Sequence, residues 1–301
     1  MRILVTGATG LIGKQLVHKL LEEGYEVNYL TTNKEKKEGV LIGAKGFYWN
    51  PYKGEIEENA LDEVHTIIHL AGSNISESWS KAGKAKIVES RIVPSNFIYE
   101  QLAKKAHSVK QIVCSSAVGL YANSSKWQSE EQYFEADNFL GNVVSQWEAA
   151  NLRFQEIGVK VSLVRIGLVL AKEGGALPQI AKMANCYLGS VLGDGKQFYS
   201  WIHIKDLVGI FLFLTKHEIE GVYNAVAPKP ETNKSFTIGL SKVLNKKILL
   251  PAVPKWVLKI AIGEKAVLVV EGQRVSSAKI EKAGYVFNYC ELKTALQEIY
   301  K

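Results

Sequence analysis

Three glycines near the amino terminus have the type and spacing of a dinucleotide-binding loop. The segment Thr6–Gly13 follows the apolar run Ile3–Val5 directly and opens a stretch of helical periodicity. Gly7 permits a tight turn, Gly10 lets the backbone approach a pyrophosphate, and Gly13 lets helix and strand pack, while the helix N-terminus offers free amides. The alternative is a glycine-rich turn without a ligand. We predict that the loop binds a nicotinamide dinucleotide through Gly7, Thr9, Gly10, Leu11, Ile12 and Gly13.

The end of the second predicted strand bears on the choice between NAD and NADP. An acidic residue there accepts hydrogen bonds from the ribose 2′-hydroxyl and repels a 2′-phosphate. This chain has Thr31, Thr32, Asn33 and Lys34 instead, with no acidic residue before Glu35. We therefore favour NADP(H), with Thr31 and Thr32 lining the site. NAD is the alternative if the lysines at 34, 36 and 37 only form a solvated loop.

Apolar strands alternate with helical segments through the first three quarters of the chain. We predict strands at residues 2–6, 25–31, 64–70, 111–115, 161–166 and 221–227, and helices at 14–23, 79–106, 138–156 and 178–188. This alternation predicts an α/β fold with a doubly wound parallel sheet of the Rossmann type. Pro94 should kink or divide the second helix, since proline lacks an amide donor.

Prolines at 228, 230, 251 and 254 break the last part of the chain into short pieces that end in a helix at 291–300. We therefore predict a dinucleotide-binding Rossmann domain over 1–228, with insertions around 172–203 that border a cleft. A small C-terminal α/β lobe over 229–301 should lie on the substrate side.

Composition narrows the class of protein. The 301 residues are 47% hydrophobic and 22% charged, as in ordinary globular proteins. The net charge is +7, but the lysines are spread along the chain, so we expect no nucleic-acid partner. Cys114, Cys186 and Cys290 have no metal-ligand spacing, so we expect no metal and a reducing compartment. Without a signal peptide or an uninterrupted apolar span, we expect a cytoplasmic protein that binds no membrane. The oligomeric state is not indicated.

Further motifs extend the glycine loop into a family resemblance. The spacing Gly-x-x-Gly-x-x-Gly resembles the first turn of extended short-chain dehydrogenases/reductases. The whole chain resembles the atypical, epimerase-like members that carry a C-terminal domain of unknown function. The most specific matches lie in the last third. The matching pieces are TGATGLIG at 6–13, IIHLAG at 67–72, the helix from Trp79 to Arg91, SSAVGLY at 115–121, QWEAA at 146–150, VRIGLVL at 164–170, GDGKQFYSWIHIKDL at 193–207, YNAVAP at 223–228 and VEGQR at 270–274.

The resemblance implies that NADP(H) lies along the carboxyl ends of the strands and that the C-terminal lobe covers a substrate cleft. It implies that Leu70 and Ala71, followed by Gly72, line the adenosine and ribose. Arg91 would reach the cofactor from its helix, and Val169 would lie near the nicotinamide. Many members have arginine where this chain has Thr32. Lys34 is the candidate replacement for that arginine.

The usual chemistry of the superfamily needs a tyrosine as general acid/base, a lysine four residues later and a serine or threonine that holds the substrate oxygen. Counted back from Glu148, the tyrosine and lysine positions are Leu140 and Val144, and neither side chain moves a proton. The ordinary pair is therefore absent.

Three other side chains are candidates for catalysis: Tyr121, Ser116 and His203. His203 lies between two isoleucines, and a packed, hydrogen-bonded role is its alternative. Asp206 is predicted to cap a helix over 207–215. Two functions remain open. One is an NADP(H)-dependent oxidoreductase or epimerase acting on an unidentified small carbonyl or sugar-like substrate. The other is a sensor or interaction protein that binds the dinucleotide with little turnover.

Overall fold

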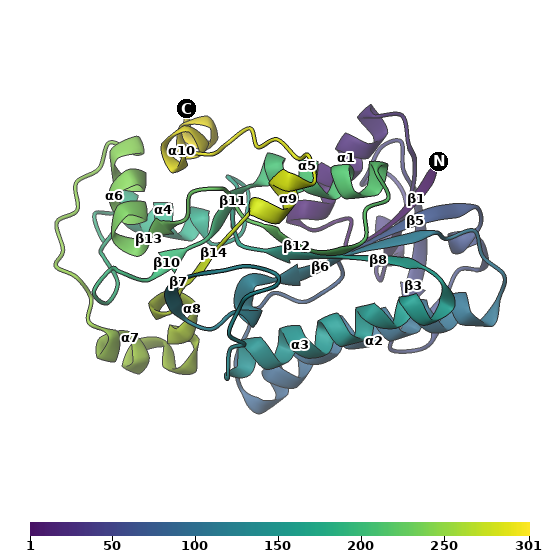
Figure 1. Ribbon diagram of the computed structural model, residues 1–301, viewed down its shortest axis with the longest axis horizontal. Helices are drawn as coiled ribbons and strands as arrows, with labels where there is room; N and C mark the ends of the chain where they lie inside the picture. Colours follow the sequence, from purple (N-terminus) through teal and green to yellow (C-terminus); the bar gives the residue numbers. More distant parts are fainter. The chain divides into compact units, whose positions relative to one another are not determined.

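The eight-stranded sheet at the centre of the fold is built from the apolar runs of the first 225 residues (Figure 1). A computed structural model describes all residues, 1–301. Along the sheet the strands run β12-β8-β6-β5-β1-β2-β3-β4. Their bounds are β1 Arg2–Thr6, β2 Glu26–Thr31, β3 Lys45–Asn50, β4 Glu55–Ile56, β5 Val64–His69, β6 Gln111–Ala117, β8 Lys160–Ile166 and β12 Gly221–Ala225.

The order of the strands reverses at β1. This strand pairs in parallel with β2 on one side and with β5 on the other, and β2 pairs in parallel with β3 and β5 with β6. Ligands of open α/β sheets bind outside the carboxyl ends of the strands at such a reversal. The predicted parallel Rossmann sheet is confirmed, and the glycine loop after β1 lies at its switch point.

Helices cover both faces of the sheet. Figure 1 shows α2 and α3 on one face and α1 and α5 on the other. In α1 the buried side chains Leu16, Val17 and Leu20 share one side because they are spaced three and four residues apart. The helices are α1 Leu11–Glu22, α2 Lys81–Lys104, α3 Phe139–Leu152, α4 Leu177–Asn185, α5 Ile204–Lys216, α6 Asn233–Val243, α7 Lys255–Ile262, α8 Val267–Val270, α9 Ala278–Lys282 and α10 Leu292–Tyr300.

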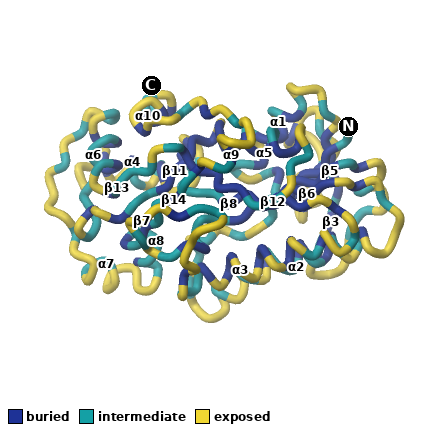
Figure 2. Tube along the Cα trace, in the orientation of Figure 1, coloured by how far each residue is buried: buried dark blue, intermediate teal, exposed yellow.

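The chain folds into two compact units that interleave along the sequence. Unit 1 comprises residues 1–116, 142–164 and 208–222, and unit 2 comprises 117–141, 165–207 and 223–301. The core of unit 1 lies under the sheet and includes Leu4, Ile67 and Ile112, on strands that are almost entirely buried in Figure 2. The predicted domain division at residue 228 stays a prediction. None of the helices combines the length and the apolar content that crossing a bilayer requires.

Unit 2 is built from short paired strands and small helices. The strand pairs are β9 (Leu168–Leu170) with β11 (Trp201–His203), β10 (Phe198–Tyr199) with β13 (Glu231–Thr232), and β7 (Ser124–Gln128) with β14 (Gln273–Val275). Its core joins Trp201 and Phe236 to Leu292 and Leu296 of the last helix. The C-terminal residues are therefore part of this core.

One local prediction was wrong and another was wrong in part. Helix α2 runs without a break from Lys81 to Lys104, so Pro94 does not divide it, and a kink at Pro94 stays a prediction. Asp206 is not an N-cap, because α5 begins at Ile204 and places Asp206 inside its first turn. Its buried carboxylate accepts hydrogen bonds from the backbone amides of Asn288 and Tyr289, both at 2.9 Å. Asp206 therefore fastens the segment that leads into the last helix.

Candidate dinucleotide site

The three loop glycines differ in what the fold itself demands of them. Gly7 has a φ of +66°, and a Cβ there would lie 2.7 Å from the carbonyl oxygen of Leu70. A Cβ at Gly13 would lie 2.3 Å from the carbonyl oxygen of Gly7, so α1 packs on the loop only without a side chain at this position. A Cβ at Gly10 would meet only the Gly7 oxygen, at 3.2 Å. The fold thus needs glycine at positions 7 and 13, whereas a Cβ at Gly10 would require only the Gly7 oxygen to shift by a few tenths of an ångström.

The amino end of α1 is open to an anion. Gly10 is the N-cap residue and supplies no side chain to the helix, and the first turn holds no acidic residue. The first amides of a helix have no acceptor within it and carry the positive end of its dipole. Thr9, Leu11 and Ile12 are partly exposed and Gly10 is exposed. This surface fits the pyrophosphate of a dinucleotide.

A buried relay of hydrogen bonds joins the ends of β1 and β5. The Thr6 hydroxyl accepts the amides of Leu70 and Ala71, both at 3.1 Å, and lies 2.8 Å from Nδ1 of His69. With both lone pairs occupied, the hydroxyl donates its proton to Nδ1, so Nε2 carries the ring proton and donates it to Ser95 at 3.1 Å. Burial lowers the pKa of His69 to about 4. A neutral histidine therefore holds Leu70 and Ala71 beside the glycine loop.

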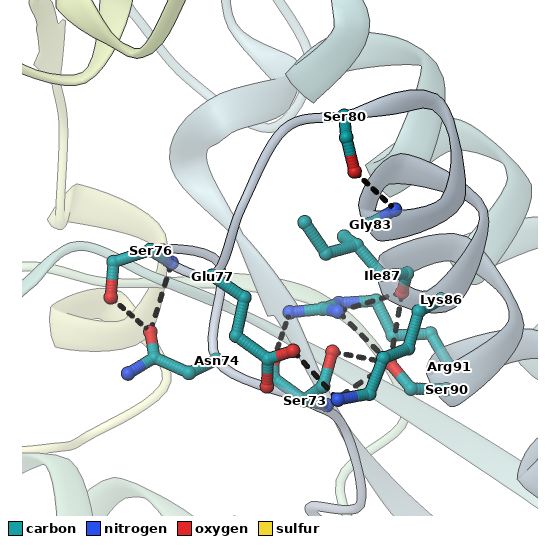
Figure 3. Close-up of polar contacts among 10 residues, drawn as sticks. All are labelled: Ser73, Asn74, Ser76, Glu77, Ser80, Gly83, Lys86, Ile87, Ser90 and Arg91. Atoms are coloured by element: carbon teal, nitrogen blue, oxygen red, sulfur yellow. Dashed lines mark hydrogen bonds and ion pairs between the residues drawn. The ribbon is translucent and has the colours of Figure 1, made fainter. Parts of the chain in front are cut away.

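The loop after β5 is tied to α2 by Arg91 (Figure 3). One guanidinium nitrogen of Arg91 donates to the Ser73 carbonyl at 3.1 Å and the other to the Ile87 carbonyl at 2.8 Å. The guanidinium lies 5.1 Å from the ring centroid of Trp147, and its Cγ would contact a Cβ added at Gly72, at 3.5 Å. The side chain of Arg91 therefore packs against the exposed Gly72 and holds the loop in place.

The charge of Arg91 is not matched by a carboxylate. Burial alone lowers its pKa, and none of the ion pairs of the structure includes it. A half-buried cation without a counter-charge favours an anionic ligand. The arrangement fits the expectation that Arg91 faces a phosphate-bearing cofactor.

The end of β2 offers exposed cations to such a ligand. Thr31 is buried and its hydroxyl accepts the Asn33 amide at 3.2 Å, whereas Thr32 is exposed. Among the lysines that follow, Lys37 forms an ion pair with Glu57 at 2.5 Å, so its charge is already neutralised by a protein carboxylate. The ammonium of Lys34 lies 4.9 Å from the ring centroid of Tyr48, and Lys36 is exposed. Lys34 and Lys36 are thus the cations left near the end of this strand.

Ser116, at the carboxyl end of β6, has a partner that sequence reasoning did not name. Its hydroxyl donates to the Glu148 carboxylate on α3 at 2.5 Å, and both side chains are buried in unit 1. Glu148 served only to locate the missing tyrosine and lysine. A hydroxyl that hands its proton to a buried carboxylate is an arrangement suited to general base chemistry. Leu140 and Val144, which stand at the positions counted for the usual tyrosine and lysine, lie on the same helix.

Tyr121 lies in unit 2, buried between two polar partners. Its hydroxyl donates to the Asn224 side-chain oxygen at 2.6 Å and accepts from Arg165 at 2.9 Å. Burial raises its pKa to about 12, against the opposing effect of Arg165. Tyr121 therefore stays protonated at neutral pH.

His203 is held on both ring nitrogens. Nδ1 accepts the Lys205 amide at 3.2 Å, so Nε2 carries the proton and donates to Glu298 at 2.8 Å. Its ring lies 3.9 Å from that of Tyr289, and burial lowers its pKa. This geometry fits a packed, hydrogen-bonded role for His203. Its catalytic role stays a prediction. Val169 lies on β9 beside Ile202 and is partly exposed.

Comparisons with known proteins identify relatives that match the chain over nearly its whole length. An epimerase family protein of Arabidopsis thaliana, the chloroplastic homologue of SDR39U1, is 35% identical over 99% of this chain and 86% of its own length. The human epimerase family protein SDR39U1, solved with NADPH, is 29% identical with a TM-score of 0.89, over 100% of this chain and 99% of that one. A nucleoside-diphosphate sugar epimerase of Corynebacterium glutamicum is 28% identical with a TM-score of 0.79, over 100% of this chain and 58% of that one.

Family models divide the sequence between two descriptions. Residues 3–225 match the NAD dependent epimerase/dehydratase family, and residues 253–299 match a domain of unknown function, DUF1731. Both halves of the predicted resemblance are thereby confirmed. The chain belongs to the NAD dependent epimerase/dehydratase family and carries the C-terminal domain of unknown function that its motifs predicted.

Proposed function

We propose that this protein is an NADP(H)-dependent oxidoreductase or epimerase acting on a small carbonyl or sugar-like substrate. The observation that carries the proposal is the open amino end of α1 at the switch point of the sheet, where the exposed backbone of Gly10 forms the N-cap. Arg91, on α2 and without a carboxylate partner, adds a cation that is bonded to the neighbouring loop. The human relative solved with NADPH supports the choice of cofactor.

The residues of this chain would hold and orient the cofactor. Gly10, Leu11 and Ile12 would present backbone amides to the pyrophosphate, Lys34 would face the 2′-phosphate, and Arg91 would hold the loop from Leu70 to Gly72 against the adenosine side. When bound, the nicotinamide supplies hydride exchange.

Proton transfer requires a group other than the missing tyrosine and lysine. We assign it to Ser116 and Glu148: the Ser116 oxygen accepts the proton of a substrate hydroxyl while its own proton passes to the carboxylate. Tyr121 is a poorer candidate for the base. Its raised pKa keeps it protonated, and its hydroxyl already donates to Asn224 and accepts from Arg165.

One observation favours a second function, a dinucleotide-binding sensor with little turnover. All three candidate catalytic side chains already have protein partners: Asn224 for Tyr121, Glu148 for Ser116 and Glu298 for His203. Following the absorbance of NADPH against a panel of carbonyl compounds separates the two. Oxidation of NADPH supports the enzyme, whereas tight binding without oxidation supports the sensor.

Cofactor binding itself is tested with Gly10→Asp. A carboxylate beside the pyrophosphate should weaken NADPH binding about tenfold or more, since like charges about 4 Å apart cost on the order of 1–4 kcal/mol near a protein surface. His18→Asp is the matched control. It introduces the same side chain at an exposed position about two turns further along α1. Calorimetric titration should give unchanged binding for this control. Equal NADPH affinity in both variants would show that the loop does not bind the cofactor.

A further inference from the structure

A cavity in unit 2 has walls that differ from those of the dinucleotide site. Its volume is about 270 Å³, and it is bounded by α4, α6, α7, α8 and the loop over 188–192. Helices α4 and α6 pack against each other above the shared core that contains Phe236 and Leu240. The cavity therefore lies inside a formed part of unit 2.

The lining of this cavity contains no ionisable acid or base other than the phenol of Tyr199. Its walls are aliphatic, aromatic or hydroxyl-bearing, apart from the thioether of Met183 and the amide of Asn233, and an ion enclosed there would have no counter-charge. The lining residues are Ile180, Met183, Ala184, Leu188, Gly189, Ser190, Leu192, Tyr199, Asn233, Phe236, Thr237, Leu240, Ser241, Val253, Leu258 and Val269. A phosphate, a carboxylate or a nucleotide is thus a poor occupant, and a neutral apolar molecule is a good one.

Most polar groups of the lining are bound to the protein. Asn233 accepts the Leu192 amide at 2.8 Å and donates to Tyr199 at 3.0 Å, and Tyr199 donates to the Val269 carbonyl at 3.2 Å. Ser190 donates to the Pro251 carbonyl at 2.5 Å. These groups fix the wall and do not need a ligand.

Two hydroxyls on α6 are the exception. Thr237 and Ser241 are 7% and 4% exposed and lie one helical turn apart on the cavity side, yet neither side chain makes a hydrogen bond. Ser95 on α2, by contrast, donates its hydroxyl proton to the Arg91 carbonyl of the preceding turn at 2.8 Å. Their oxygens are not among the fully buried side-chain atoms that lack a partner, so both hydroxyls are open to the cavity. The pair is therefore placed to bind a polar group of a molecule inside the cavity.

We propose that this cavity is a binding site for a neutral, largely apolar small molecule that carries one hydroxyl or carbonyl group. Its polar group bonds to Thr237 and Ser241, and its apolar body lies against Phe236, Leu240 and Leu258. At about 30 Å³ per non-hydrogen atom, taken from liquid water, the volume holds roughly nine such atoms. Met183 and Leu188 at the rim are 48% and 50% exposed and line the way in.

The probe for this site is 1-octanol, which has an eight-carbon chain and one hydroxyl. Calorimetric titration of the full-length protein without dinucleotide should give saturable binding of 1-octanol, and octanoate at pH 7.5 should bind at least tenfold more weakly. The experiment is independent of cofactor binding, so its failure leaves the proposed function untouched. Absence of 1-octanol binding, or equal binding of octanoate, overturns the proposal.

Two substitutions locate the probe. Thr237→Val keeps the shape of the side chain and removes its hydroxyl, which should weaken 1-octanol binding about three- to tenfold. Thr215→Val is the matched control, because Thr215 is a fully buried hydroxyl without a partner that does not line the cavity. Ser241→Leu should abolish binding by filling the space, and circular dichroism checks that this variant folds. Equal effects of Thr237→Val and Thr215→Val would contradict the assignment.

Discussion

Lowering the pH from 7.5 to 4.5 should remove about 2.5 kcal/mol of folding free energy through His69 alone. Burial lowers the pKa of this histidine to about 4 in the folded protein, against 6.5 for the exposed side chain. Between these two values the unfolded chain binds a proton that the folded chain does not. Stability is therefore complete above pH 6.5 and falls by about 1.4 kcal/mol for each pH unit below it.

The hydrogen bonds around His69 explain why its neutral imidazole does not bind a second proton in the folded protein. Thr6 accepts the amides of Leu70 and Ala71 with its two lone pairs and gives its own proton to Nδ1 of the histidine. A second ring proton, on Nδ1, would point at an oxygen with no lone pair left. Protonation would therefore break the link between β1 and β5 at the edge where the glycine loop lies.

Urea unfolding of the wild-type protein and of His69→Asn, at four pH values between 7.5 and 4.5, measures the effect. The variant has no titrating group at this position, so its unfolding free energy should fall by about 2.5 kcal/mol less than that of the wild type. His65→Asn, on the same strand, is the matched control and should keep the wild-type slope. Equal loss of stability in the wild type and His69→Asn would refute the reasoning. His203, whose pKa burial also lowers, is present in all three proteins and cancels.

Three further predictions concern other groups. Lys34→Gln should weaken NADPH binding about two- to fivefold and leave NADH binding unchanged in calorimetric titrations, because an exposed cation contributes little beyond its contact with the 2′-phosphate; equal losses for both cofactors would contradict its role. Asp206→Asn should lower the unfolding free energy by about 3 kcal/mol and speed proteolysis after residue 285, since an amide offers one oxygen where the carboxylate offers two to Asn288 and Tyr289. Ser116→Ala should cost about 1–3 kcal/mol in urea unfolding by removing a hydrogen-bond donor from buried Glu148; an unchanged unfolding midpoint would contradict a stabilising role for this hydrogen bond.

The alternation of apolar strands and helices made the central sheet predictable. Central predicted strands are rich in Ile, Val or Leu and have nearly every side chain buried, as in β1 and β5. Strand β3 was not predicted, because only Phe47 and Trp49 are buried and glycine and lysine precede them at the edge of the parallel pairs. Edge strands with one buried face give a weaker pattern than central strands with two.

The glycine loop of the site could be predicted from the sequence, whereas pairs of side chains distant in sequence could not. The spacing of Gly7, Gly10 and Gly13 reports backbone geometry within one loop, and the structure shows that geometry. The pairing of Ser116 with Glu148 joins residues 32 positions apart, and that of Asp206 with Asn288 joins residues 82 apart. Such pairs follow from how the elements pack and not from spacing along the chain. An aspartate before a helical run is typical of an N-cap, which is why Asp206 was misassigned.

The interleaving of the two units also constrains how this protein is made. The chain passes from one unit to the other five times between residues 116 and 223. During synthesis, domains ordinarily fold as they emerge, amino-terminal part first. Here unit 2 lacks Leu292 and Leu296, which pack in its core, until residues 292–296 have left the ribosome. Until then Trp201 and Phe236 lack these two core partners, so we expect the nascent chain to expose apolar surface that a chaperone can bind.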